Sequence, residues 1–126
     1  MKESPKVKID RFMLDTNGVS LGRKHWSIDT ILRAVEGLPE YDLQLSAIDL
    51  NVSVWRGGVD SIYEFIWQMN RVNNADLSYP IIQTPWGYIC DGWHRVCKAV
   101  LQGDTTIKAV RLVVMPDPDS IDPETK

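Results

Sequence analysis

Residues 88–95 read Tyr-Ile-Cys-Asp-Gly-Trp-His-Arg, and this stretch decides the fold. An apolar strand ends, Asp91 and Gly92 form a tight turn, and a helix begins directly after them. The first backbone N–H groups of a helix have no partner within the helix and lie at the positive end of its dipole. A glycine at the turn lets a ligand approach the backbone closely. The stretch therefore predicts an anion site at the start of the helix, of the kind that holds phosphate.

Side chains in the first turns of this helix add to the prediction. His94 and Arg95 provide donors, and Lys98 lies on the same helix face as His94. In a competing interpretation Asp91 caps the helix and the basic side chains are solvated. Cations at a helix N-terminus oppose the dipole, which weighs against a purely solvated role. The candidate ligand-binding residues of the helix are Gly92, His94, Arg95 and Lys98.

The elements on either side of this stretch predict a small arrangement of mixed helices and strands. Residues 80–83 and 88–90 are short apolar runs separated by a turn that contains proline and glycine, which predicts a hairpin. A helix is expected over residues 93–102, followed by a strand rich in β-branched residues over 107–114. Upstream, residues 42–50 predict a short strand and a turn.

The clearest helix of the sequence follows Ser61. Ser61 and Glu64 have the spacing of a capping box, in which each side chain satisfies a backbone N–H of the first turn. An apolar stripe follows at helical spacing, formed by Ile62, Phe65, Ile66, Met69 and Val72. Tyr63 and Trp67 form a second stripe, so we expect this helix to be buried over much of its circumference.

The N-terminal part of the chain predicts a hairpin followed by a helix. Residues 6–14 alternate as a strand, residues 15–18 contain an Asn-Gly turn signal, and residues 19–21 are expected to return as the second strand. Ser27 is a good N-cap, and apolar residues recur after it at helical spacing.

The charge of the chain is unevenly distributed. The 126 residues carry 14 Lys plus Arg and 17 Asp plus Glu, a formal charge of −3. Residues 116–126 hold four acids, one lysine and three prolines, so the rest of the chain is formally neutral. This balance speaks against a general nucleic-acid binder, whose affinity depends on Lys and Arg. We expect an N-terminal hairpin and helix extension over residues 1–39, the main domain over 40–115, and a disordered acidic tail over 116–126.

The sequence also bears on the cellular compartment and on metals. It contains no run of about 20 apolar residues, the length that a membrane span needs, and its N-terminus lacks the apolar core of a secretory signal. Cys90 and Cys97 are expected to be free thiols, as in a reducing compartment. We therefore expect a cytoplasmic protein with no membrane partner. A zinc site built from Cys90, His94, Cys97 and the distant His25 is not expected, because the spacing is not a usual ligand pattern.

With these elements in place, residues 43–114 resemble the ParB/sulfiredoxin superfamily. The resemblance is carried by the Pro-Ile-Ile strand at 80–82, the Asp-Gly-x-His-Arg segment that starts at Asp91, the helix that ends in glycine and the last strand. It implies a small single-domain α+β fold, a mixed sheet with helices packed on it. It also implies binding of a nucleoside triphosphate, ATP or CTP with Mg²⁺, at the start of that helix. Arg56 resembles a second phosphate-contacting arginine of ParB-like proteins.

Departures from the family pattern limit the activities to be expected. Sulfiredoxin has its reactive cysteine where this chain has Trp93, so sulfiredoxin chemistry is not expected. The free-serine kinase branch uses a glutamate that residues 51–55 do not offer. Hydrolysis of ATP or CTP and phosphotransfer remain open, with Asp91 and His94 as the catalytic candidates. We rank nucleotide binding above hydrolysis, and hydrolysis above transfer. Without a helix-turn-helix or dimerisation domain, the chain is not expected to be a complete partition protein.

A second hypothesis belongs to a different class. A lone ParB-like domain could be a phage- or plasmid-type accessory protein without enzymatic activity, which binds a protein partner or DNA. Residues 1–39 lie outside the resemblance and are the expected surface for a partner or a homodimer. DNA binding is not favoured by the neutral body of the chain.

Overall fold

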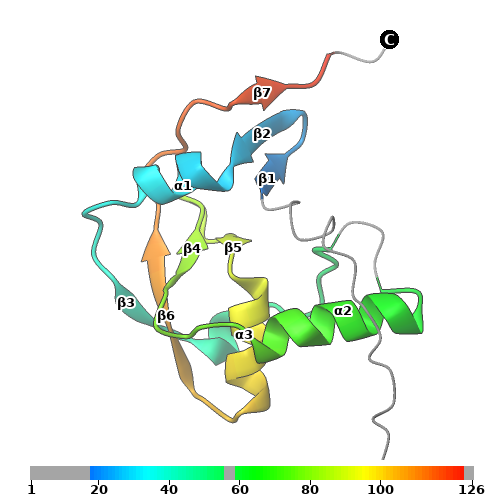
Figure 1. Ribbon diagram of the computed structural model, residues 1–126. Helices are drawn as coiled ribbons and strands as arrows, with labels where there is room; N and C mark the ends of the chain where they lie inside the picture. The colour runs from blue at the N-terminus through cyan, green and yellow to red at the C-terminus, as the bar shows by residue number, and fades with distance from the viewer. Residues whose placement is uncertain (1–17, 56–58, 124–126) are drawn as a thin grey trace, which may run out of the picture.

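The computed structural model describes residues 18–55 and 59–123, and over these residues it shows three α-helices and two β-sheets (Figure 1). The α+β class expected from the sequence is confirmed. In chain order the elements are β1 (Gly18–Leu21), β2 (Lys24–Ser27), α1 (Ile28–Ala34), β3 (Tyr41–Gln44), the 3₁₀ turn η2 (Leu45–Ala47), α2 (Ile62–Asn73), β4 (Ile81–Gln83), β5 (Ile89–Asp91), α3 (Trp93–Leu101), β6 (Thr106–Arg111) and β7 (Ser120–Ile121).

The larger sheet has the strand order β3-β6-β4-β5 and is mixed, because β4 runs parallel to β6 while the other pairs are antiparallel. Residues alternate between the two faces of a strand, and both faces of β4 are covered. Ile81 packs with Val96 and Ala99 of α3 in one core cluster. Ile82 packs with Trp26 and Ile31 in a second cluster. The sheet therefore lies between α3 on one face and α1 with the small sheet on the other.

The small sheet has the order β1-β2-β7. Strand β1 pairs with β2 in an antiparallel register that sets Val19 opposite Trp26, and both side chains are buried. The expected return strand at residues 19–21 thus lies in β1, but its described partner is β2. The strand predicted for residues 6–14 lies outside the described residues, as does most of the predicted turn at 15–18.

The acidic tail corrects a prediction, because its described part, residues 116–123, is ordered against β2 and α1. The carbonyl of Pro116 accepts a 2.7 Å hydrogen bond from the indole N–H of Trp26. The carboxylate of Asp119 accepts hydrogen bonds from the backbone N–H of Ser27 and the hydroxyl of Thr30, and these bonds lower its pKa. An acidic residue of the kind that suggests disorder in the sequence therefore holds this segment in place through hydrogen bonds.

A second set of contacts holds the end of the same segment. His25 Nε2 lies 2.8 Å from Asp122 Oδ2, and His25 Nδ1 lies 2.7 Å from Ser20 Oγ. The backbone N–H of Asp122 donates to the carbonyl of Arg23, whose guanidinium donates to the carbonyl of Asp122. Segments nearly one hundred residues apart in sequence are thus joined on one small sheet.

Helix α2 begins as predicted but packs differently. Its N-cap is Ser61, whose hydroxyl accepts from the backbone N–H of Glu64, while the Glu64 carboxylate accepts from the backbone N–H of Asp60. The buried side chains of the helix are Trp67, Gln68 and Val72. The prediction that the helix is buried over much of its circumference is wrong. The first three members of the predicted core stripe, Ile62, Phe65 and Ile66, are exposed.

The hairpin β4–β5 and the helix after it are confirmed, and Gly92 joins them. Gly92 has a φ of 107°, and a Cβ atom at this position would lie 2.7 Å from Cγ2 of Ile81. The glycine is thus required by its backbone conformation and by the close approach of the turn to β4. This requirement exists without a ligand, so the packing of the turn is by itself a sufficient reason for glycine at this position.

The close approach at Gly92 can be tested by mutation. We expect Gly92→Ala to destabilise the protein by about 2–4 kcal/mol, because left-handed strain adds to a steric clash. Gly103→Ala is the matched control, since Gly103 has a φ of 83° and no atom within 4 Å of its added Cβ. The control is expected to lose about 1 kcal/mol from strain alone. Urea unfolding of both variants measures the difference, and equal losses would contradict the packing argument.

Candidate functional site

The start of α3 is a helix N-terminus without a side-chain cap. The N-cap residue is Gly92, which has no side chain to cap the first turn, and no side-chain cap is found among residues 18–55 and 59–123. Val96 donates the first hydrogen bond of the helical ladder, to the carbonyl of Gly92. The backbone N–H groups of residues 93–95 precede that ladder and lie at the positive end of the dipole. The interpretation in which Asp91 caps the helix is therefore wrong, because Asp91 is the last residue of β5 and its carboxylate binds Arg95.

His94 is held from two sides. Its Nε2 lies 2.6 Å from the side-chain oxygen of Gln68 on α2, which makes Nε2 the protonated nitrogen. Its ring stacks on Trp55 of the preceding loop, with ring centroids 5.2 Å apart and planes inclined by 25°. Burial, together with the charges of Arg71 and Arg95, lowers the pKa of His94 to about 4. The imidazole is thus neutral at neutral pH and is a weak base there.

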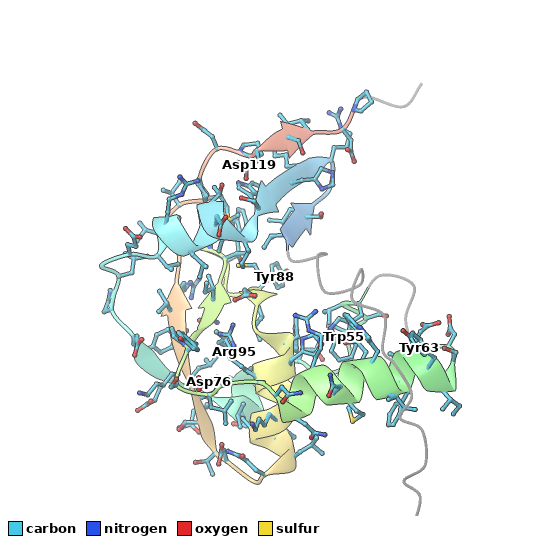
Figure 2. The ribbon with its side chains drawn as sticks, viewed as in Figure 1. Trp55, Tyr63, Asp76, Tyr88, Arg95 and Asp119 are labelled. Carbon is cyan, nitrogen blue, oxygen red and sulfur yellow. The ribbon has the colours of Figure 1, made fainter. Side chains whose placement is uncertain are left out.

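Arg95 lies where the sequence placed it, but its guanidinium already has partners. Its Nη2 forms a 3.0 Å ion pair with Asp91 one helical turn earlier. Its Nη1 donates to the carbonyls of Tyr79 and Pro80. Figure 2 shows Arg95 reaching from α3 toward the segment that leads into β4. Arg95 therefore ties the first turn of α3 to the start of β4, and a bound anion would share it with Asp91.

Arg71 is a site residue that sequence reasoning missed. It projects from α2, and its guanidinium carbon lies 5.2 Å from the centroid of the Trp67 ring. Burial lowers its pKa, while the Asp91 carboxylate raises it. Its charge also acts on His94. These charge effects indicate that Arg71 lies near both residues. The packing of α2 on α3 brings it there, and no local sequence motif predicts that packing.

Another predicted ligand-binding residue, Lys98, does not join this group. The Lys98 ammonium donates to the carbonyls of Asn73 and Ala75, at distances of 3.1 and 2.7 Å, and so binds the carboxyl end of α2. A cation is favourable there because the C-terminal end of a helix dipole is negative. Arg56 lies outside the described residues. The α3 site is accordingly defined by Trp55, Gln68 and Arg71 together with residues 91–95.

An apolar hollow of about 390 Å³ adjoins the α3 site. Trp55 and Trp93 belong to its wall, so the two features share a boundary. The hollow is lined by Leu50, Val52, Ser53, Val54, Trp55, Val59, Met69, Trp93, Cys97, Val100 and Leu101. Figure 2 shows the Trp55 side chain beside α2 and the start of α3.

The two cysteines are free thiols whose surroundings disfavour the thiolate. Burial raises the pKa of Cys90 to about 12, with a further contribution from the Asp91 carboxylate. Burial also raises the pKa of Cys97, which lines the hollow. The thiolate is the nucleophilic form of cysteine, so both shifts lower the nucleophilicity of these side chains at neutral pH.

The described residues also bear on metal binding and on membrane insertion. Within residues 18–55 and 59–123, no group of three or more His, Cys, Asp and Glu side chains is placed to hold a metal ion. None of the described helices combines the length and apolar character needed to cross a membrane.

Comparisons with known proteins add no assignment. Neither protein-family models, nor curated proteins, nor solved structures match this chain.

The buried histidine predicts a pH dependence of stability. Its pKa is about 4 in the folded protein and 6.5 in the unfolded chain, so the unfolded state binds more protons between these values. Stability should therefore fall as the pH decreases from 6.5 to 4, by about 1–2 kcal/mol after allowance for the partial exposure of the ring.

Urea unfolding at several pH values measures this dependence. The control is His94→Gln, which removes the titrating ring and should flatten the slope between pH 4 and 6.5 relative to the unmodified protein. An identical slope in the two proteins would contradict the assignment to His94.

Proposed function

We propose that this chain is a ParB/sulfiredoxin-like domain that binds a nucleotide or another phosphorylated ligand at the α3 site. The observation that carries the proposal is the uncapped N-terminus of α3, which lies close to the guanidinium groups of Arg71 and Arg95. The order of strands and helices around the Asp-Gly-x-His-Arg segment supports the same assignment. The backbone N–H groups of residues 93–95 would hold the phosphate oxygens.

The local charge balance favours an anionic ligand. Burial is the main cause of the lowered pKa of His94, and the guanidinium groups of Arg71 and Arg95 lower it in the same direction, as expected for positive charge near the start of α3. Asp91 contributes one negative charge, and the imidazole contributes none at neutral pH. The helix dipole adds to the positive potential. Phosphate, with its concentrated negative charge, suits such a site better than a carboxylate does.

Mg²⁺ bound to a nucleoside triphosphate would neutralise part of the phosphate charge. Asp91 lies within the site and could share that cation. When the ligand enters, Arg95 would exchange part of its contact with Asp91 for a contact with phosphate. Such an exchange costs little, because a guanidinium group offers five N–H donors in a planar fork.

Binding is a better supported function than catalysis. His94 is a weak base at neutral pH, and its protonated nitrogen faces Gln68. The carboxylate of Asp91 is paired with Arg95. Hydrolysis of ATP or CTP therefore ranks below binding, and phosphotransfer ranks below hydrolysis. We propose a cytoplasmic location, as expected from the sequence.

Ligand-induced stabilisation tests the proposal. ATP, CTP, GTP and inorganic phosphate, each with and without Mg²⁺, are added to the purified protein, and its Tm is measured. At least one nucleotide is expected to raise Tm, because selective binding to the folded state stabilises it. Arg71→Gln and Arg95→Gln should weaken its binding about tenfold to one hundredfold, since each removes charge-assisted hydrogen bonds.

Lys108→Gln is the matched control, because Lys108 is an exposed cation on β6 outside the α3 site. It should leave the shift unchanged. The absence of a shift with every ligand would overturn the proposal. Equal losses in all three variants would show that the effect comes from net charge and not from this site.

The ring of His94 provides a second readout that reports position. A phosphate bound beside it adds negative charge and should raise its pKa above the value of about 4 in the free protein. An NMR titration of the histidine side chains, with and without the nucleotide that raises Tm, measures this change. A ligand that raises Tm but leaves the His94 titration unchanged binds elsewhere.

A further inference from the structure

Helix α2 presents an apolar seam to solvent. Ile62, Phe65 and Ile66 follow the spacing of a helix face that packs against another helix, yet they are 77%, 52% and 48% exposed. The opposite face of α2 carries Trp67, Gln68 and Val72, which are buried in this chain. The helix therefore has two packing faces, of which the fold covers one.

The seam is part of a larger apolar patch, which extends over the loop before α2 and the end of α3. Its exposed members are Leu50, Val52, Val54, Val59, Ile62, Tyr63, Phe65, Ile66, Val100 and Leu101. Tyr63 lies near the end of α2 that points away from α3 (Figure 2). The exposed fractions of these residues correspond to roughly 900 Å² of surface, close to the surface of about 800 Å² that each partner loses in a standard protein interface. A patch of this size on a globular domain marks an interaction site.

The shape of the apolar patch suits a second copy of the same chain. A two-fold interface brings the same surface of each subunit together, so a single patch must carry both projecting and receiving features. The apolar seam of α2 forms the projecting feature. The hollow lined by the loop before α2, by Met69 and by the end of α3 lies beside it. Side chains from one copy can therefore fill the hollow of the other.

The apolar patch consists of uncharged side chains, and the carboxylates beside it along the chain belong to Asp60 and Glu64. The nearest charged group on α2, Glu64, is engaged with Ser61 and the backbone of Asp60. An antiparallel arrangement of the two α2 helices also aligns their dipoles favourably.

We propose that this protein forms a homodimer in which α2 packs against α2 of a second copy through the apolar patch. The inference does not depend on ligand binding at the α3 site. It differs from the sequence expectation of a dimer through residues 1–39, because Val19, Trp26 and Ile31 of that region are buried within the chain.

Sedimentation equilibrium of the full chain tests the dimer over about 1–100 μM, the range in which a moderately stable dimer dissociates. The unmodified protein is expected to show a monomer–dimer equilibrium. Ile62→Glu and Phe65→Glu should each raise the dimer Kd at least tenfold, because each would bury a charge without a partner. Both side chains are exposed in the single chain, so the variants should keep its circular dichroism spectrum, and their Tm should not depend on protein concentration.

Leu32→Glu is the control, since Leu32 is 47% exposed on α1 and lies outside the apolar patch. It should leave the dimer Kd unchanged. Two results would overturn the inference: a monomer at every concentration, or a dimer that survives both Ile62→Glu and Phe65→Glu. Neither outcome bears on ligand binding, which the Tm measurements test separately.

Discussion

The close approach of Gly92 to Ile81 is the constraint on which the rest of the structure depends. It brings the end of β5 against β4 with no space for a Cβ atom, and it directs α3 back across the sheet. Val96 and Ala99 then pack on the face that carries Ile81. The same turn leaves the first N–H groups of α3 beyond the reach of any side-chain cap. One steric requirement thus fixes a core contact and exposes a positively polarised helix end.

The local elements could be predicted because their signals are local. Ser27 and Ser61 cap the helices that follow them, and the hairpin before Gly92 has its turn residues within a few positions. The apolar stripe of α2 led to a wrong prediction of burial, because spacing shows that a helix face is apolar without showing what covers it. The tail misled because acids and prolines resemble a disordered composition, whereas Asp119 satisfies backbone and hydroxyl donors at the start of α1.

The candidate site likewise contains residues that local sequence predicts and residues that only tertiary packing brings together. Residues 91–95 are adjacent in sequence, so their proximity follows from one turn. Arg71 and Gln68 arrive from α2 across the helix pair, and only the tertiary arrangement reveals them. Lys98 shares a helix face with His94 in the sequence pattern, but carbonyl groups at the end of α2 compete for its ammonium. Backbone carbonyls at a helix end are strong acceptors, and their positions cannot be read from the spacing of side chains in the sequence.

The contacts between β2 and β7 also have a consequence for how the chain folds. Trp26 and Pro116 are 90 residues apart, and His25 and Asp122 are 97 apart. During synthesis the segment around Trp26 emerges long before its partner, so the second core cluster stays open until nearly the whole chain is available. Such long-range closure slows folding, because the entropy of the intervening chain is lost before the contacts form. The early segment would spend that interval with Trp26 only partly covered, and a chain shortened before Pro116 would lack the carbonyl that accepts from the Trp26 indole N–H.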